Sequence, residues 1–248
     1  MIFGNLKTDG RRAFGKIAAL AFGALVVTGC ESLNDASNDP FEDVNRVVFD
    51  FNNKLDNAVF EPIAKGYEAN IHKDIRYVVS SALKHIKTPV ILANNILQAD
   101  PAGIENTVTR FVSNTVLGVG GLDDWASRNG RPYREEDFGQ TLAVWGVGEG
   151  PYLVLPIIGP MSTRDGAGRL VDSFADPLNE IDSLAFEWSH RGIGALDTRA
   201  GLIKILDDLE RTSLDYYAAV RSLYRQKRKD KIANGKNGGP VPVPNIKF

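Results

Sequence analysis

Apolar residues recur at helical spacing over most of the chain after residue 38. The longest stripe runs from Leu202 to Leu223, and charged residues such as Lys204 and Asp208 occupy the opposite face. A stripe of this kind is typical of an amphipathic helix. Packing against a protein core is the favoured interpretation, and a face lying on a membrane is the alternative. The whole pattern predicts helices at 40–58, 73–87, 89–98, 101–116, 177–190 and 196–226.

Several of these helices have a capping residue followed by proline at their expected start. Proline is tolerated at the first helical position because its missing N–H has no intrahelical partner there. The pairs are Asp39-Pro40, Thr88-Pro89, Asp100-Pro101 and Asp176-Pro177. Glu42 follows the first pair at capping-box spacing. The folded part is therefore expected to begin at Asp39.

Strand-like alternation does not persist long enough anywhere to predict a sheet. The segment "YLVLPII" at 152–158 has the composition of a short strand, but Pro156 interrupts it. Proline lacks the N–H that a central strand needs. The prediction is a mainly α protein with one helical domain at 39–226.

The segment 137–160, "DFGQTLAVWGVGEGPYLVLPIIGP", is apolar and also rich in glycine and proline. Such a backbone cannot form a regular helix or a central strand. Irregular backbone within a membrane is tolerated where protein covers it or where it lines a water-filled cavity. One interpretation is therefore that the segment forms the wall of a channel or pocket that is partly embedded in a membrane. A buried loop of a soluble core is equally compatible with the residues.

The first thirty residues have the organisation of a bacterial lipoprotein signal. Basic residues precede the apolar run 17–27, which is short for a membrane span, and "VTGC" closes the segment at Cys30. The pattern predicts a signal peptide at 1–29, lipidation of Cys30 and a polar tether at 30–38. Residue 31 is Glu rather than the Asp associated with inner-membrane retention, so the outer membrane is favoured.

The chain ends in a segment of different character, 227–248. It is basic at first and then rich in glycine and proline, which predicts an extended or disordered tail. Contact with lipid phosphates or with an acidic partner is one interpretation. A solvated tail without a partner is the other.

Composition and motifs exclude several classes of function. A net charge of −2 offers no overall attraction for nucleic acid. One cysteine and three histidines, none spaced as ligand pairs, predict no metal site. The chain has no nucleophile elbow, no H-E-x-x-H, and no phosphate-binding loop behind a strand. The prediction is that the protein is not an enzyme.

Four blocks in one order resemble the VacJ/MlaA family of outer-membrane phospholipid-transport lipoproteins. They are "DPFEDVNRVVFDFNNKLD" at 39–56, "RFVSNTVLGVGGLDDWA" at 110–126, the segment 137–160 and "TRDGAG" at 163–168. The resemblance covers about Asp39 to Asn179. It agrees with the lipoprotein signal that ends at Cys30. It is looser in the last third of the chain.

This resemblance implies a ring-like helical domain with a central amphipathic channel, placed in the inner leaflet of the outer membrane. It implies removal of phospholipids that have strayed into the outer leaflet, which maintains lipid asymmetry. The implied partners are phospholipid, a trimeric porin and a soluble periplasmic lipid-carrier protein. The protein would be lipid-anchored on the periplasmic side of the outer membrane, without a cofactor.

Candidate site residues follow from the resemblance and from the segments described above. The candidates for channel wall or rim are Trp145, Gly146, Gly148, Gly150, Pro151, Tyr152, Leu155 and Pro156. The candidates for a hinge or a close helix contact are Gly118, Gly120 and Gly121. The candidates for polar positioning or structural pairing are Asn45, Arg46, Asn52, Arg110 and Asn114. For the two arginines, pairing with acids inside the fold is the favoured interpretation.

Two other classes of function stay open on the residues alone. A structural envelope lipoprotein would bind porins without moving lipid. A lipid hydrolase would need a nucleophile, and the sequence offers no candidate for one.

Overall fold

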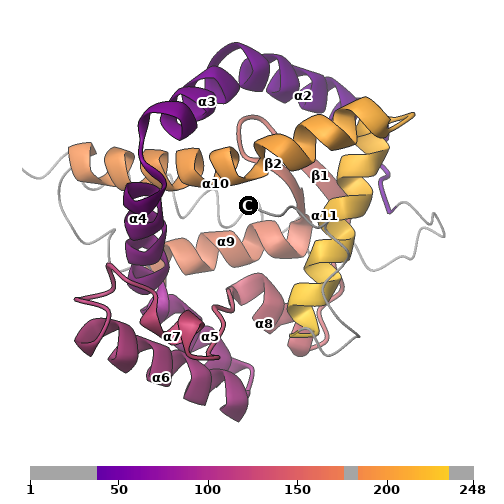
Figure 1. Ribbon diagram of the computed structural model, residues 1–248. Coiled ribbons are helices and arrows are strands. Elements are labelled where there is room, and N and C mark those ends of the chain that lie inside the picture. The colour runs from indigo at the N-terminus through magenta and orange to yellow at the C-terminus, as the bar shows by residue number, and fades with distance from the viewer. Residues whose placement is uncertain (1–37, 176–183, 235–248) are drawn as a thin grey trace, which may run out of the picture.

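The helices are arranged as a ring around a central opening (Figure 1). The computed structural model describes residues 38–175 and 184–234. Its elements are α2 (Glu42–Leu55), the π-helix η1 (Asp56–Phe60), α3 (Glu61–Asn70), α4 (Lys73–Ile86), α5 (Thr88–Leu97), α6 (Pro101–Val116), α7 (Trp125–Arg128), α8 (Phe138–Val144), β1 (Tyr152–Leu155), β2 (Gly159–Ser162), α9 (Thr163–Ala175), α10 (Leu184–Thr212) and α11 (Tyr216–Ile232). The predicted mainly α, ring-like class is confirmed. The predicted signal peptide and Cys30 lie outside the described residues.

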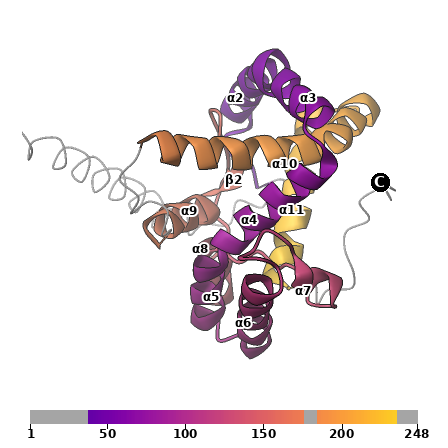
Figure 2. The same ribbon diagram turned by 60° about the vertical axis from the view of Figure 1, so that its left-hand side comes forward.

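The elements follow one another around the ring. In Figure 1, α2 and α3 form the top, α4 descends one side, and α5 to α8 form the bottom. Helix α11 closes the other side, and α10 and α9 cross the ring. Figure 2 shows α5 and α6 next to each other at the opposite end of the molecule from α2 and α3. The ring therefore closes between the first described helix and the last one.

The helices predicted at 73–87, 89–98 and 101–116 are present within one residue of those bounds as α4, α5 and α6. The end predicted at residue 58 is wrong, because η1 and α3 continue the first helix to Asn70. Pro62 lies in the first turn of α3 and has no N–H for an α-type bond. The wider turn of η1 directly precedes it, so the chain continues where an α-helix would break.

The helix predicted at 196–226 is two helices. Helix α10 ends at Thr212, and α11 begins after Asp215, whose Oδ1 accepts the Ala218 N–H at 3.1 Å. This cap lets α11 start in a new direction. Helix α11 then continues to Ile232, so the first residues expected in the tail are helical. Of the helix predicted at 177–190, only the part from Leu184 is described, within α10.

The expectation that the chain contains no sheet is wrong. β1 and β2 form an antiparallel hairpin in which Tyr152 faces Ser162 and Leu155 faces Gly159. Pro156 lies in the turn between the strands, where no ladder hydrogen bond is needed. Ile157 has a left-handed φ of 68°, which completes the reversal. The proline that argued against a strand therefore marks its end.

Asp39 is not the N-cap of the first helix. The N-cap position is Phe41, and Asp39 is buried below the helix start. Its carboxylate accepts hydrogen bonds from Asn45 of α2 and from Tyr217 and Arg221 of α11. Burial explains the difference, because a buried carboxylate needs strong partners and a single capping bond would leave it undersatisfied.

Buried residues of the described chain include many polar side chains. Apolar clusters are small: one joins Ala64 to Ile203, and another joins Tyr152, Val154 and Tyr217. Asn95, Gln140 and Thr141 are at least 98% buried. In contrast, many large apolar side chains are exposed on the ring. The usual distribution of a water-soluble protein is thus partly reversed.

Candidate functional site

A cavity of about 770 Å³ lies within the ring. Helices α5, α9, α10 and α11, the residues before α8 and the hairpin all contribute to its wall. The apolar part of the lining consists of Val90, Ile91, Ile158, Pro160, Met161 and Leu202. The polar part consists mostly of charged side chains, namely Lys87, Glu135, Glu136, Asp137, Asp165, Arg169, Asp172, Lys227, Arg228 and Lys231. The cavity is therefore amphipathic.

Ion pairs join α11 to the segment before α8 at the cavity wall. The Lys231 Nζ lies 2.8 Å from Glu135 Oε2, and the Lys87 Nζ lies 3.1 Å from Glu135 Oε1. Burial alone would raise the pKa of Glu135, but these two ammonium groups outweigh it and lower the pKa to about 2. Glu135 therefore stays ionised and connects the two sides of the ring.

Arg228 makes the strongest link in this wall. Its two terminal nitrogens each lie 2.6 Å from an oxygen of Asp137, and Nη2 also lies 2.8 Å from Asp165. Burial favours the neutral form of Asp137, yet Arg228 lowers its pKa to about 2. A bidentate pair of this kind fixes orientation as well as charge. It holds α11 against the start of α8 and the start of α9.

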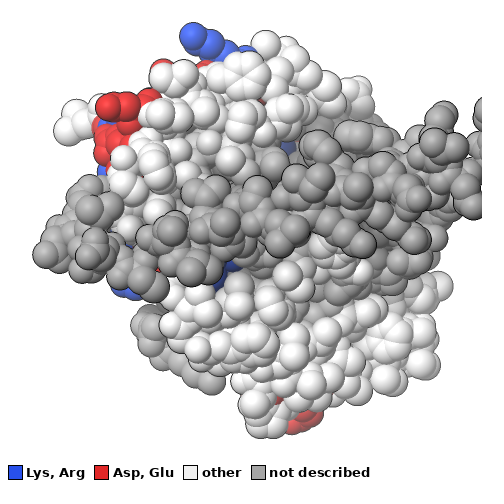
Figure 3. Space-filling view, turned by 180° about the vertical axis from the view of Figure 1, so that it is seen from behind, with Lys and Arg blue, Asp and Glu red and all other residues white. Residues whose placement is uncertain are grey.

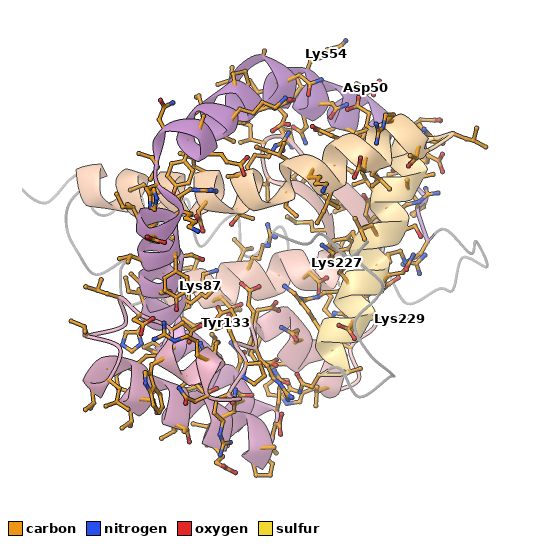
Figure 4. All side chains as sticks on the ribbon, viewed as in Figure 1. Asp50, Lys54, Lys87, Tyr133, Lys227 and Lys229 are labelled. Atoms are coloured by element: carbon orange, nitrogen blue, oxygen red, sulfur yellow. The ribbon has the colours of Figure 1, made fainter. Side chains whose placement is uncertain are left out.

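Two cations of the lining, Arg169 on α9 and Lys227 on α11, form no ion pair with any described residue. Figure 4 shows Lys87 and Lys227 on opposite sides of the opening. Positive groups without a protein partner remain available to an anionic ligand. The cavity can therefore receive a phosphate group.

Two carboxylates of the lining also have no cationic partner among the described residues. Glu136 is 4% exposed, and its Oε2 accepts a hydrogen bond from Gln98 at 3.0 Å. Burial raises its pKa to about 7. Asp172 accepts from Asn94 at 3.1 Å and from the Phe138 N–H at 2.8 Å, and burial raises its pKa as well.

The predicted wall residues lie elsewhere. None of the eight candidates from Trp145 to Pro156 lines this cavity; the hairpin contributes Ile158, Pro160 and Met161 instead. Trp145 is exposed and donates from its indole nitrogen to the Leu97 carbonyl at 3.0 Å. Tyr152 is buried in the apolar cluster with Tyr217. The segment was interpreted as one unit, but the alternating sides of β1 and the turns around it separate its side chains.

The glycine turn after α6 is packed against neighbouring backbone. A Cβ on Gly118 would lie 2.2 Å from the Asp123 carbonyl oxygen, and one on Gly121 would lie 2.3 Å from the His85 ring. Gly120 has open space beside it and a left-handed φ of 70°. Close approach explains Gly118 and Gly121, and backbone conformation explains Gly120. A hinge motion at this turn stays a prediction.

Asn45 and Asn52 hold the hairpin against α2. The Asn45 amide donates to the Tyr152 carbonyl at 3.0 Å and accepts from the Val154 N–H at 2.9 Å. Asn52, two turns later, donates to Leu155 at 2.9 Å and accepts from Ile157 at 2.7 Å. The two asparagines thus supply backbone hydrogen-bond partners that a further strand beside β1 would otherwise supply.

The remaining polar candidates pair inside the fold. Arg46 lies 2.6 Å from Asp215 and 2.7 Å from Glu42. Arg110 lies 2.9 Å from Asp124, which also accepts from Asn114 at 3.0 Å. These contacts agree with the pairing interpretation of the arginines. None of the five polar candidates lines the cavity.

The charged lining of the cavity was missed in the sequence. Adjacent acids such as Glu135, Glu136 and Asp137 are typical of a solvated turn, and residues 227–231 were expected to belong to the tail. The usable signal was the spacing of Lys227 and Lys231, one helical turn apart and continuous with the preceding helix. The acidic partner of Lys231, Glu135, lies 96 residues away in the chain, which no local pattern indicates.

The outside of the ring carries many exposed apolar side chains. On α2, Val44, Val47 and Phe51 are all more than half exposed, while Asn45 on the same helix is buried against the hairpin. Similar exposed residues follow on η1, α3 and α6: Val59, Phe60, Ile63, Val108, Phe111, Val112 and Val116. Seen from behind, most of the visible described surface is uncharged, with charged side chains mainly toward the edges and a few basic atoms beside the grey segments (Figure 3). Such a surface indicates contact with lipid or protein.

None of the described helices is both long enough and apolar enough to span a membrane. In the same residues, no group of three or more histidine, cysteine, aspartate or glutamate side chains is arranged to hold a metal ion.

Comparison with known proteins decides the family. The family model described as MlaA lipoprotein matches residues 37–231. The chain belongs to the MlaA lipoprotein family. It is 36% identical over 239 residues to the intermembrane phospholipid transport system lipoprotein MlaA of Escherichia coli (strain K12), with 93% of each chain covered. It is 33% identical over 224 residues to the protein of the same description from Haemophilus influenzae, with 86% of this chain and 88% of that one covered.

A solved structure of the family has the same fold. The structure, described as "Structural basis for maintenance of bacterial outer membrane lipid asymmetry", is similar with a TM-score of 0.70 and 32% identity. The match covers 78% of this chain and 98% of that one. An uncharacterised protein of Rickettsia bellii is also 35% identical over 216 residues, covering 87% of this chain and 83% of that one. The ring is thus a fold of the family.

Proposed function

We propose that this protein removes phospholipids from the outer leaflet of the outer membrane and passes them toward the periplasm, which maintains lipid asymmetry. The observation that carries the proposal is the combination of an apolar outer surface with a charged cavity inside one ring. The relatives named as phospholipid transport lipoproteins support it. The proposed ligand is a phospholipid.

The mechanism follows from the different solvation of the two ends of a lipid. Moving a charged headgroup through hydrocarbon is very costly, because the charge loses its water without gaining a partner. In the cavity, Lys227 and Arg169 face the headgroup while Ile91, Leu202 and Met161 contact apolar parts. The headgroup thus stays in polar surroundings as the lipid enters the ring. No covalent step is needed.

The proposed position of the cavity in the envelope involves an anchor, an outer contact surface and a carrier. Acylation of Cys30 would anchor the protein to the outer membrane from the periplasmic side. The exposed residues of α2 and α6 would contact the inner leaflet or a trimeric porin. A soluble periplasmic carrier would receive the lipid.

A cavity-filling variant tests the route. Leu202→Trp places an indole at the cavity wall, and Leu214→Trp makes the same change at a fully exposed position between α10 and α11. In a host that lacks its own family member, Leu214→Trp and the unmodified protein should lower outer-leaflet phospholipid equally. Leu202→Trp should not lower it at the same protein level. Full activity of Leu202→Trp would contradict the proposed route.

The alternative function is a structural envelope lipoprotein that binds porins without moving lipid. Exposed apolar residues of the ring are compatible with it. A transfer assay with the periplasmic carrier separates the two. Porin co-purification without lipid reaching the carrier would favour the structural role.

A further inference from the structure

The cavity contains unpaired charges of both signs. Three of its carboxylates, Glu135, Asp137 and Asp165, are paired with cations of α11. Glu136 and Asp172 form no ion pair with a described residue, although both line the same cavity. A buried carboxylate without a cation is costly to ionise. A ligand that brings a cation to these two positions would therefore stabilise the ionised carboxylates.

A hydrogen-bond network fixes the positions of these two carboxylates. Gln98 Nε2 donates to Glu136 at 3.0 Å and to Thr141 Oγ1 at 3.2 Å. Thr141 donates to Asn94 Oδ1 at 2.7 Å, and Asn94 Nδ2 donates to Asp172 at 3.1 Å. The network thus runs between α5, α8 and α9 with a carboxylate at each end. Both are preorganised, so a ligand need not order them.

Neither carboxylate is needed to hold the helices by an ion pair. Arg228 and Lys231 already join α11 to the opposite wall through other acids. Glu136 accepts one side-chain hydrogen bond, from Gln98, which a neutral glutamine at position 136 would accept equally well. Asp172 accepts with both oxygens, from Asn94 and from the Phe138 N–H, but neither donor is charged. No ion pair within the described residues therefore accounts for a negative charge at either position.

The opposite charge is present in the same cavity. Lys227 and Arg169 also line it and form no ion pair within the described residues. A ligand that carries a phosphate and an ammonium group would satisfy both sets at once. A phosphoglycerol headgroup would pair only with the cations and would leave Glu136 and Asp172 without a cationic partner.

We propose that the cavity recognises a zwitterionic lipid headgroup with a primary ammonium, of the phosphoethanolamine class. The phosphate is bound by Lys227 and Arg169, and the ammonium is bound by Glu136 and Asp172. A primary ammonium has three donors for carboxylate oxygens, whereas a quaternary ammonium has none. The inference rests on the proposed function, because it names the lipid that the proposed route prefers.

Competition between headgroups tests this preference. The acylated full chain is purified in detergent and incubated with equimolar phosphatidylethanolamine, phosphatidylglycerol and phosphatidylcholine of identical acyl chains. Native mass spectrometry then measures how much of each lipid the protein retains. We expect about fivefold more phosphatidylethanolamine than either other lipid, as one or two charge-assisted hydrogen bonds would produce in a partly solvated cavity. Glu136→Gln combined with Asp172→Asn should bring the ratio close to one.

The matched control is Asp50→Asn, which removes an exposed carboxylate on the outer side of α2 (Figure 4). It should keep the fivefold ratio, and the far-ultraviolet circular dichroism of all variants should be unchanged. Equal retention of the three lipids by the unmodified protein would overturn the headgroup preference while leaving lipid transport in place. Retention of no lipid would overturn both proposals. Displacement of the lipid by equimolar soluble phosphoethanolamine would overturn the assignment to a lipid headgroup.

Discussion

Arg221 of α11 donates from Nη1 to Oδ2 of Asp39 across 2.6 Å, although the two residues are 182 positions apart. The same guanidinium nitrogen lies 2.9 Å from Glu42 at the start of α2. The Asp39 side chain is fully buried, and Tyr217 donates a hydrogen bond to the same oxygen. This contact closes the ring between its first and last described helices.

The ring should open or unfold more easily when this contact is removed. Asp39→Asn leaves Arg221 buried with less compensating charge, so the free energy of unfolding should fall by about 3 kcal/mol. Urea denaturation followed by circular dichroism measures this change. Asp43→Asn, at an exposed position on the same helix, should change it by less than about 0.5 kcal/mol. Equal stability of the two variants would show that the ring does not depend on this pair.

The hairpin should detach from α2 when Asn45 is truncated. Asn45→Ala leaves the Tyr152 carbonyl and the Val154 N–H buried without partners, which should cost about 2 to 3 kcal/mol. Hydrogen exchange at the Val154 amide should accelerate. Asn53→Ala serves as the control, because Asn53 makes no side-chain hydrogen bond within the described part of the chain. Unchanged exchange in Asn45→Ala would contradict this role.

Ionisation of Glu136 should lower the free energy of unfolding as the pH rises. Burial raises its pKa from 4.5 to about 7 in the folded state, with Asp137 and Asp100 adding to the rise and Gln98 and Arg134 opposing it. Between these two values the folded protein keeps a proton that the unfolded chain releases, so stability falls as pH rises from about 4.5 to about 7.

Glu136→Gln removes this dependence. The variant should be more stable than the unmodified protein by up to about 3 kcal/mol at pH 8, and the difference should shrink toward pH 5. Thermal or urea unfolding of both proteins over this range measures it. A difference that stayed constant with pH would show that Glu136 does not titrate in this window.

Gly118 should not tolerate a side chain, since its Cβ would lie 2.2 Å from the Asp123 carbonyl oxygen. Gly118→Ala should lower the free energy of unfolding by about 2 kcal/mol. Gly148→Ala is the matched change, because no atom lies within 4 Å of its Cβ position. Similar melting temperatures for both variants would contradict close packing at this turn.

Cys30→Ser should prevent acylation. The serine variant has no thiol to receive a diacylglycerol, so it should remain an uncleaved precursor without the mass of acyl chains. Mass spectrometry of the membrane fraction measures this. Normal maturation of the variant would remove the proposed anchor.

The sequence alone determined the helical character of the protein and several helix bounds. Apolar spacing and the proline at a helix start act within a few residues, so α4, α5 and α6 could be predicted almost to their ends. The expectation that the glycine- and proline-rich segment 137–160 is irregular is wrong for much of its length, because α8 (Phe138–Val144) and β1 (Tyr152–Leu155) lie within it. Its hairpin was missed because the partners of β1 include Asn45 and Asn52, more than a hundred positions away.

Only the tertiary structure decided which residues form the cavity. Glu136 and Lys227 are ordinary surface residues by local pattern, and they face one cavity because the helices close into a ring. The partners of Arg221 and Arg228 are likewise chosen by distance in space, since charge attraction and burial do not depend on sequence separation. Helix formation is a local property of the chain, whereas the charges of the cavity acquire their roles from contacts that exist only in the folded ring.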